Sequence, residues 1–394
     1  MPPSPPSGHF GLVPGVPARC GRRASLGDRR ASARRRFITR ERARISVFST
    51  GPERQHRPAG RRTQRGETMT QDVHDTLASW FDSYAVEGRL HDVPPHAVHE
   101  VTVDGRRAVC KVARGETADV GAEAAAMAHA DRHTDLPVPS VVAADEDAFV
   151  ASWVDGLPDE DAAPDAGEVT DAYARALGRT LARLHAATAD AFPRPGFPRL
   201  GGAWGPDDST GSLVVDAHED WHAVARDYVA EARAYLADIG RADPADEVLA
   251  LLDDRPDLFA GAGTPVLCHG NLLPDHVGFE RDAGDPVAVA AVIDFEHALV
   301  APAEYDLWRT ALPVFFRGSP TPDPAYEAFR EGYGSVRPLP HGVERRRDAW
   351  VVVTLVSYLV ALDVQNRGIG PDERPRAEGI AEKISETAAD LRSR

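Results

Sequence analysis

Two short polar segments of this chain each follow an apolar stretch that is typical of a strand. The first, "CHGNLLPDHVGFE", spans residues 268 to 280 and gathers His269, Asn271, Asp275 and His276 within eight positions. In the second, Asp294 ends the apolar run "VAVAAVID". A carboxylate at a strand end emerges at the mouth of a cleft, where it suits a hard cation such as Mg²⁺ that bridges substrate phosphates. We therefore expect phosphate chemistry where the two segments meet.

Other interpretations of these residues stay open. A zinc site is disfavoured because no cysteine pair and no paired histidine spacing accompanies the loop. A solvated aspartate at a strand end and a polar loop without chemistry are the two structural alternatives.

The segment before residue 159 predicts a hairpin, a helix and a second hairpin. Two Val-rich runs flank Asp104 and Gly105, a turn pair typical of hairpins, and Lys111 lies near the end of the second run. The helix-forming stretch "TADVGAEAAAMAHADRH" follows and contains Glu123. "VPSVVAADEDAFVASWVDG" then predicts two further strands around an acidic turn.

The rest of the chain is mainly helical in its patterning. Leu177, Leu181 and Leu184 follow helical spacing in "TDAYARALGRTLARLHAAT". Further helices are expected at residues 219 to 238, 244 to 253, 304 to 316, 322 to 333, 343 to 364 and 372 to 392. Residues 349 to 362 form an apolar run of 14, which is too short to cross a bilayer as a helix and is expected to be buried.

Residues 1 to 68 differ in composition from everything that follows. They carry 16 Arg and 4 acidic residues without sustained apolar periodicity. "RRRFITR" is similar to a twin-arginine export signal, but no apolar stretch follows it, so export is disfavoured. We interpret Met69 as the true start and residues 1 to 68 as a mis-called leader, with a disordered basic tail as the alternative.

The composition of residues 69 to 394 excludes several classes of partner. This part carries 29 basic and 57 acidic residues, and a surface that acidic repels nucleic acid and anionic membranes. Only two lysines occur, Lys111 and Lys383, and the dense negative charge indicates a halophilic cytoplasm where salt screens it. The three cysteines have neither disulfide-type nor metal-type spacing, which fits buried thiols in a reducing compartment.

The order of the motifs resembles that of the aminoglycoside phosphotransferase and choline kinase family, relatives of the protein kinases. The shared series is a lysine-bearing strand, a helix with an acidic residue, "LARLH", "HGNLLPDHV", "VIDFEHA" and "AEYDLWRT". The resemblance covers nearly all of residues 69 to 394. It implies an α+β, bilobal protein-kinase-like fold with a small antiparallel sheet lobe over residues 69 to 158. A larger helical lobe, with the catalytic loop and acceptor pocket, would span residues 159 to 394.

The same resemblance implies a role for each site residue. Lys111 would hold the α- and β-phosphates of ATP, and Glu123 would orient Lys111 by an ion pair. The main chain of "FVASWVDG", including Ala151 and Trp153, would bind adenine as an interlobe hinge. His276 and Asp294 would bind Mg²⁺, while His269 and Asp306 would brace the loop between them.

The sequence departs from the family pattern at two places. Asn271 stands where the family usually has its catalytic Asp, and His276 stands where it usually has a metal-binding Asn, a replacement that is similar to macrolide phosphotransferases. The phosphate-covering turn "VPPHAVHEV", residues 93 to 101, contains no glycine. We interpret His96 and His99 in it as exposed. Trp308, Trp350 and Tyr358 are more typical of core packing than of an acceptor pocket.

Two functions are therefore expected from the sequence. The first is an ATP-dependent O-phosphotransferase that uses Mg²⁺ and a small-molecule hydroxyl acceptor, with Asn271 orienting the hydroxyl and Asp294 holding the cation. The alternative is a catalytically impaired pseudokinase that binds a nucleotide or metabolite, because an amide at position 271 cannot take a proton. The acceptor and the oligomeric state are not readable from the residues.

Overall fold

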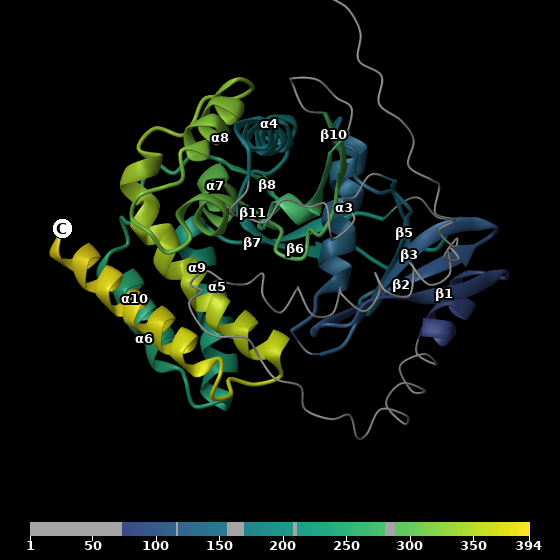
Figure 1. The fold of residues 1–394 in the computed structure, drawn as a ribbon, viewed down its shortest axis with the longest axis horizontal. Coiled ribbons are helices and arrows are strands. Elements are labelled where there is room, and N and C mark those ends of the chain that lie inside the picture. Colours follow the sequence, from purple (N-terminus) through teal and green to yellow (C-terminus); the bar gives the residue numbers. More distant parts are fainter. Residues whose placement is uncertain (1–72, 116, 156–168, 208–210, 280–287) are drawn as a thin grey trace, which may run out of the picture.

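The computed structural model describes residues 73–115, 117–155, 169–207, 211–279 and 288–394 (Figure 1). Residues 1 to 68, interpreted above as a leader, lie outside this range, as does Met69. A small sheet with its helices comes first in the chain and a larger, mostly helical part follows. The fold class is the α+β, bilobal, protein-kinase-like arrangement expected from the sequence.

The first part is a five-stranded antiparallel sheet in the order β1-β2-β3-β5-β4. Its elements are β1 (Tyr84–His91), β2 (His96–Val103), β3 (Arg106–Ala113), α3 (Val120–His133), β4 (Val141–Ala144) and β5 (Ala148–Ser152). Both predicted hairpins are present. The sequence analysis missed β1, which pairs with β2 as the sheet edge.

The hairpin between β2 and β3 forms where the sequence predicts it. Asp104 and Gly105 both have positive φ, 48° and 74°. Two such residues make the turn whose twist matches antiparallel strands. The turn fixes the register that sets Lys111 on β3 opposite Val98 on β2, and β5 places Phe149 on the other side of Lys111.

Two hydrophobic cores hold the sheet in place. The smaller core lies between the sheet and the helical residues 73–80, and it includes Val73, Leu77 and Val101. The larger core runs from α3 and Phe149 into the helical part. Because α3 packs against β6 and β7 of the second part as well as against the sheet, it ties the two parts together.

The second part combines seven α-helices with two small sheets among the described residues, besides a 3-10 turn at Pro274–His276 and a π-helical turn at Leu312–Phe316. The four-stranded sheet has the order β7-β6-β11-β8, and β9 pairs with β10. The strands are β6 (Gly196–Leu200), β7 (Leu213–Ala217), β8 (Pro265–Cys268), β9 (Val277–Phe279), β10 (Val289–Val292) and β11 (Leu299–Pro302). The helices are α4 (Asp171–Ala187), α5 (Trp221–Asp238), α6 (Asp243–Asp254), α7 (Ala303–Ala311), α8 (Ala325–Gly334), α9 (Val343–Asn366) and α10 (Arg374–Ser393).

The apolar helix α9 is a core helix of the second part. It is long and apolar enough to cross a membrane by length and composition alone, but 67% of its most apolar window is buried inside the protein. Trp350 on α9 is 1% exposed, and its indole N–H donates to the buried Glu304 carboxylate at 2.8 Å. The buried Arg346 of α9 also pairs with Glu304. These contacts fasten α9 to α7.

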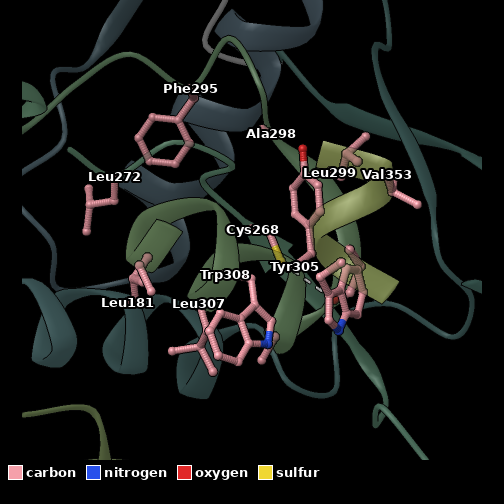
Figure 2. Packing of buried hydrophobic residues seen from close by; sticks show 14 of the residues in the cluster. Leu181, Cys268, Leu272, Phe295, Ala298, Leu299, Tyr305, Leu307, Trp308 and Val353 are labelled. Atoms are coloured by element: carbon pink, nitrogen blue, oxygen red, sulfur yellow. Dashed lines mark hydrogen bonds between the residues drawn. The ribbon is translucent and has the colours of Figure 1, made fainter. Parts of the chain in front are cut away.

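The core around α7 and β8 supports the loop that follows Cys268 (Figure 2). Tyr305, Leu307 and Trp308 of α7 and Cys268 at the end of β8 belong to one buried cluster. Burial also raises the pKa of the Cys268 thiol well above its usual range. Trp308 and Trp350 are thus core residues, as expected, and the loop begins from a rigid base.

Candidate active site

The pairing of β9 with β10 brings Asp294 and His276 together. Val292 lies opposite Val277, and the Ile293 N–H donates to the His276 carbonyl oxygen at 3.0 Å. His276 precedes β9 and Asp294 follows β10, so both side chains leave the same end of this ribbon. The Nε2 atom of His276 lies 3.2 Å from Oδ2 of Asp294. Asp294 has a φ of 71°, an uncommon left-handed conformation that aspartate tolerates better than most residues.

Lys111 joins this pair from the small sheet. Its Nζ atom lies 2.7 Å from Oε2 of Glu123, 3.0 Å from Oδ1 of Asp294 and 3.5 Å from Oε2 of Glu296. The Lys111 side chain is 9% exposed. One ammonium group thus faces three carboxylates, two of which come from the segment after β10, so the two parts of the fold meet at this cluster.

The electrostatics of the cluster keep Lys111 charged. Burial alone would lower the pKa of Lys111, but Asp294, Glu123 and Glu296 together raise it well above its usual range. Burial and the neighbouring carboxylates act to raise the pKa of Glu123, and the Lys111 ammonium opposes that shift. The pKa values of Asp294 and Glu296 are both lowered, because the Lys111 ammonium and the neighbouring histidines together outweigh burial and the repulsion between the two carboxylates.

The loop after β8 is held by one buried carboxylate on α7. Asp306, which is fully buried, accepts the N–H groups of His269 and Gly270 at 2.7 Å each. Its Oδ2 atom also lies 3.0 Å from Nε2 of the buried His185 on α4. Burial would raise the pKa of Asp306, but the bond from His185 and the other donors lower it. Asp306 therefore fixes the start of the loop from two other elements.

Gly270 is required by the shape of the same loop. Its φ is 84°, and a Cβ atom placed there would lie 1.9 Å from the carbonyl oxygen of His297. No side chain fits in that space without moving the main chain. The close approach of Gly270 to His297 sets the distance between the loop and the segment that carries Asp294 and Glu296.

His269 fixes the same two segments through its imidazole. Its Nε2 atom lies 2.9 Å from the Ile293 carbonyl oxygen, and its Nδ1 atom accepts the Asn271 N–H at 3.3 Å. Nε2 is therefore the donor, which is the neutral tautomer. Burial lowers the pKa of His269 to about 4, which agrees with the neutral form of the ring. The ring packs on Phe295 with centroids 4.4 Å apart.

His276 has a fixed orientation as well. Its Nδ1 atom donates to the Asn271 carbonyl oxygen at 2.8 Å, which leaves Nε2 directed to Asp294. Burial would lower the pKa of His276, but Asp294 and Asp275 raise it. The side-chain amide of Asn271 has no hydrogen-bond partner in the part of the chain that the structure describes, and Asn271 is partly exposed. That amide remains available to a ligand.

The turn between β1 and β2 contributes a histidine that was expected to be exposed. His96 is buried, and its Nδ1 atom lies 3.0 Å from Oε2 of Glu296. His99, on the same strand, is also buried, and burial lowers its pKa to about 4. The interpretation of both as exposed residues is wrong. His99 shares a face of β2 with Ala97 and Val101, which lie in the core that residues 73–80 cover, whereas His96 lies on the other face and contacts Glu296.

The two residues expected at the adenine hinge lie at the end of β5. Ala151 is paired on both sides, with Val109 of β3 and Val141 of β4. The Trp153 N–H donates to the Arg107 carbonyl oxygen at 3.3 Å, and the Arg107 guanidinium stacks 3.4 Å above the indole ring. Their roles in nucleotide binding stay predictions.

Two residues in the loop's surroundings were missed in the sequence analysis. His185 holds Asp306, and Arg309 on α7 donates from Nε to the Gly270 carbonyl oxygen at 2.5 Å. Both belong to motifs quoted above, "LARLH" and "AEYDLWRT", so a signal was present. Their burial could not be read from those motifs alone.

The donor set at Asp294 fits a hard divalent cation in part. The carboxylates of Asp294 and Glu296 are oxygen ligands of the kind that Mg²⁺ takes, whereas the imidazole of His276 suits softer cations better. Among the described residues, two other groups have ligand-like distances, His185–Cys268–Asp306 and His96–Glu123–Glu296. The first already bonds the loop N–H groups and the second surrounds Lys111. Neither includes His269 or His276.

Comparison with known proteins shows which family this chain belongs to. A family model described as "Phosphotransferase enzyme family" matches residues 96–341. A search of curated proteins gave no significant match. Among solved structures, a protein described as a candidate fructosamine-3-kinase from Thermobifida fusca YX-ER1 is 20% identical, with a TM-score of 0.51, over 80% of this chain and 98% of that one.

Two further structures are similar at lower identity. One is described as a candidate fructosamine-3-kinase from Haemophilus somnus 129PT; it is 14% identical over 79% of this chain and 96% of that one, with a TM-score of 0.51. The other is a thermostable mutant of aminoglycoside phosphotransferase APH(4)-Ia in ternary complex with AMP-PNP and hygromycin B. It is 14% identical over 81% of this chain and 98% of that one, with a TM-score of 0.50. At such identities these likenesses show the fold.

Proposed function

This chain belongs to the phosphotransferase enzyme family, and we propose that it transfers the γ-phosphoryl group of ATP to a hydroxyl group of a small molecule. The observation that carries the proposal is the meeting of Lys111, Glu123 and Asp294 across the two parts of the fold. A buried ammonium that is held charged where the two parts of the fold meet is suited to phosphate oxygens. The carboxylate that faces it is suited to the cation that accompanies them.

Each residue of the cluster has a defined task in this reaction. Lys111 binds the α- and β-phosphates, and Glu123 keeps its ammonium in place at 2.7 Å. Asp294 and Glu296 would hold Mg²⁺, which when bound neutralises the charge on the phosphates. The Asn271 carbonyl oxygen holds the Nδ1 atom of His276 in place. The Nε2 atom would either donate a hydrogen bond to Asp294 or bind the cation beside Asp294.

The transfer itself forms one bond and breaks one. The acceptor hydroxyl oxygen bonds to the γ-phosphorus while the bond from that phosphorus to the oxygen shared with the β-phosphate breaks, which releases ADP. The side-chain oxygen of Asn271 accepts the hydroxyl hydrogen bond and orients the nucleophile. Because the amide cannot take the proton, the hydroxyl proton passes to an oxygen of the transferred phosphoryl group and from there to water. Because the transition state is loose, positioning and charge stabilisation supply most of the rate. Lack of a general base costs about 10² to 10⁴-fold.

A non-catalytic binding protein is the second candidate. Two observations favour it: the amide at position 271, and the turn between β1 and β2, where Pro94 and Pro95 offer no N–H donors to phosphates. His96 is the polar side chain that follows this turn, and it bonds to Glu296. A binder would keep the Lys111 cluster and lack turnover.

Nucleotide binding is tested by the melting temperature with and without MgATP. A ligand at about 100 times its Kd stabilises the folded protein by about 2.7 kcal/mol. We expect a rise for the wild type that Lys111→Met abolishes. Lys383→Met is the matched control, because Lys383 is the other lysine and its side chain is 51% exposed. Equal rises in all three proteins would contradict the role of Lys111.

A further inference from the structure

The imidazole of His276 and the carboxylate of Asp294 face each other with one nitrogen and one oxygen. The Nε2 atom of His276 lies 3.2 Å from Oδ2 of Asp294, while the other carboxylate oxygen, Oδ1, lies 3.0 Å from Nζ of Lys111. The two oxygens of Asp294 are thus directed to different partners. The side chains of His276 and Asp294 are 16% and 23% exposed, so the pair is sheltered but still reached by solvent.

The hydrogen bonds of His276 leave Nε2 as the atom that can bind an ion. Its Nδ1 atom donates to the Asn271 carbonyl oxygen at 2.8 Å. A histidine that binds a metal ion through one ring nitrogen usually donates from the other to a carbonyl or carboxylate oxygen, which fixes the ring. The main chain of His276 is fixed as well, because its N–H donates to the Leu273 carbonyl oxygen and its carbonyl oxygen accepts the Ile293 N–H, both at 3.0 Å.

The two buried histidines of the same region differ from His276. Both nitrogens of His269 are bonded within the protein, Nε2 to a carbonyl oxygen at 2.9 Å and Nδ1 to an N–H at 3.3 Å. Both nitrogens of His185 are also bonded, to Tyr333 and Asp306 at 3.0 Å each. Neither ring has a nitrogen left for an ion. His276 differs because the partner of its Nε2 atom is a carboxylate that can itself bind a cation.

The separation of the two donor atoms fits one ion. In an octahedral site with bonds of about 2.1 Å, two adjacent ligand atoms lie about 3 Å apart. The 3.2 Å between Nε2 of His276 and Oδ2 of Asp294 is close to that value. An ion that both atoms bind therefore needs little movement of β9 and β10, whose pairing holds the two residues together. Glu296, two residues after Asp294, adds a second carboxylate beside Lys111.

A nitrogen donor changes which ion such a site prefers. Mg²⁺ takes oxygen ligands and demands near-ideal octahedral geometry. First-row transition ions accept imidazole as well, and within that series Mn²⁺ shares the preference of Mg²⁺ for carboxylates and other oxygen ligands. One imidazole beside carboxylates therefore favours Mn²⁺ over Mg²⁺.

We propose that this site binds Mn²⁺ in preference to Mg²⁺, with Nε2 of His276 and Oδ2 of Asp294 as two of the ligands. The inference rests on the proposed function for its premise that a cation accompanies the nucleotide here. The ion preference itself rests on the type and the separation of the two donor atoms. Mg²⁺ would still bind in the same position, but more weakly.

The test measures ion binding apart from turnover. Mn²⁺ is titrated into the wild type, His276→Asn and His218→Asn, with and without a non-hydrolysable ATP analogue, and the free ion is followed by electron paramagnetic resonance. Mg²⁺ is then added to displace the bound Mn²⁺, which gives the ratio of the two affinities. Pulsed electron paramagnetic resonance reports whether a histidine nitrogen is bound to the Mn²⁺ ion.

His218 provides the matched control because it makes contacts of the same type outside the site. Its Nδ1 atom lies 3.2 Å from the Asp216 carbonyl oxygen, and its Nε2 atom lies 2.8 Å from Oδ2 of Asp227. An asparagine at position 276 offers an oxygen in place of the nitrogen. The substitution therefore tests the kind of donor and keeps a polar side chain beside Asp294.

We expect the wild type to bind Mn²⁺ about tenfold or more tightly than Mg²⁺, because even groups that only orient a metal ligand change affinity by about 10 to 100-fold. The bound Mn²⁺ should show nitrogen coupling from a histidine. His276→Asn should lose that coupling and most of the preference for Mn²⁺, whereas His218→Asn should match the wild type. If His276→Asn fails to fold, the coupling and the affinity ratio of the wild type decide the question.

Three results would overturn the inference: equal affinity of the wild type for the two ions, bound Mn²⁺ without nitrogen coupling, or coupling that only His218→Asn removes. A MgATP-induced rise in melting temperature alongside any of them would leave the proposed function standing, with His276 as a structural partner of Asp294. A preference for Mn²⁺ in a protein whose melting temperature no nucleotide raises would instead support the ion site and contradict the proposed function.

Discussion

Replacing Asp306 with alanine should destabilise the protein more than any exposed acidic substitution. The buried carboxylate accepts the N–H groups of His269 and Gly270 at 2.7 Å and bonds His185 at 3.0 Å. Its removal leaves the N–H groups of His269 and Gly270 and the Nε2 atom of His185 without their partner, and each such buried polar group costs about 1 to 3 kcal/mol. These overlap, so we expect a loss of about 4 kcal/mol in the free energy of unfolding.

Urea unfolding at pH 7 measures this loss. Asp257→Ala is the control, because Asp257 pairs with Arg255 at 3.0 Å on the surface and its side chain is 65% exposed. An exposed pair of this kind contributes about 0 to 1 kcal/mol. Asp306→Asn keeps one acceptor oxygen and should fall between the two. A loss for Asp306→Ala within about 1 kcal/mol of the control would refute the role of Asp306 as the support of the loop.

Two further predictions concern the same loop. Gly270→Ala should cost more than Gly240→Ala: both glycines have positive φ, which costs an alanine about 1 to 2 kcal/mol, but only at Gly270 does the new Cβ meet a carbonyl oxygen, at 1.9 Å. Equal losses in urea unfolding would contradict the close approach to His297. Acid should also destabilise the protein through His269, whose pKa is lowered to about 4. The neutral His269 ring makes its full contribution to the free energy of unfolding above pH 6.5. That contribution is lost as the pH falls toward 4, because His269 of the unfolded chain binds a proton at a higher pH than His269 of the folded protein. This amounts to about 2 kcal/mol between pH 7 and 4.5. His269→Gln should reduce the acid-induced loss by that amount, and an unchanged pH dependence would count against the buried neutral tautomer.

Local patterns in the sequence predicted much of the fold, and long-range pairing explains what they missed. The turn at Asp104 and Gly105 marks the hairpin of β2 and β3, and leucine spacing marks α4. The strand β6, "GFPRL", was missed because it contains a proline and joins β11 about 100 residues later, where Val300 lies opposite Gly196. No local pattern reports such a partner.

The candidate site could be predicted where its residues lie at or near the ends of strands. Asp294 and His276 were identified from their positions after apolar strands, and Lys111 from the family resemblance of the strand that bears it. The structure brings the three together. The contact of His96 with Glu296 depends on the course of the turn between β1 and β2, which composition does not reveal. The bond from Arg309 to the Gly270 carbonyl oxygen likewise depends on how α7 packs against the loop, which composition does not reveal.

The most direct test of the account is ADP release from MgATP with a pool of hydroxyl compounds, for the wild type, Asp294→Asn and Asn271→Asp. We expect slow turnover by the wild type, loss of it in Asp294→Asn, and an increase of up to about 10² to 10⁴-fold in Asn271→Asp, where a general base is restored. Turnover that survives Asp294→Asn unchanged would contradict the role of the cluster. Turnover by Asn271→Asp alone would show that the natural protein is the non-catalytic binding protein.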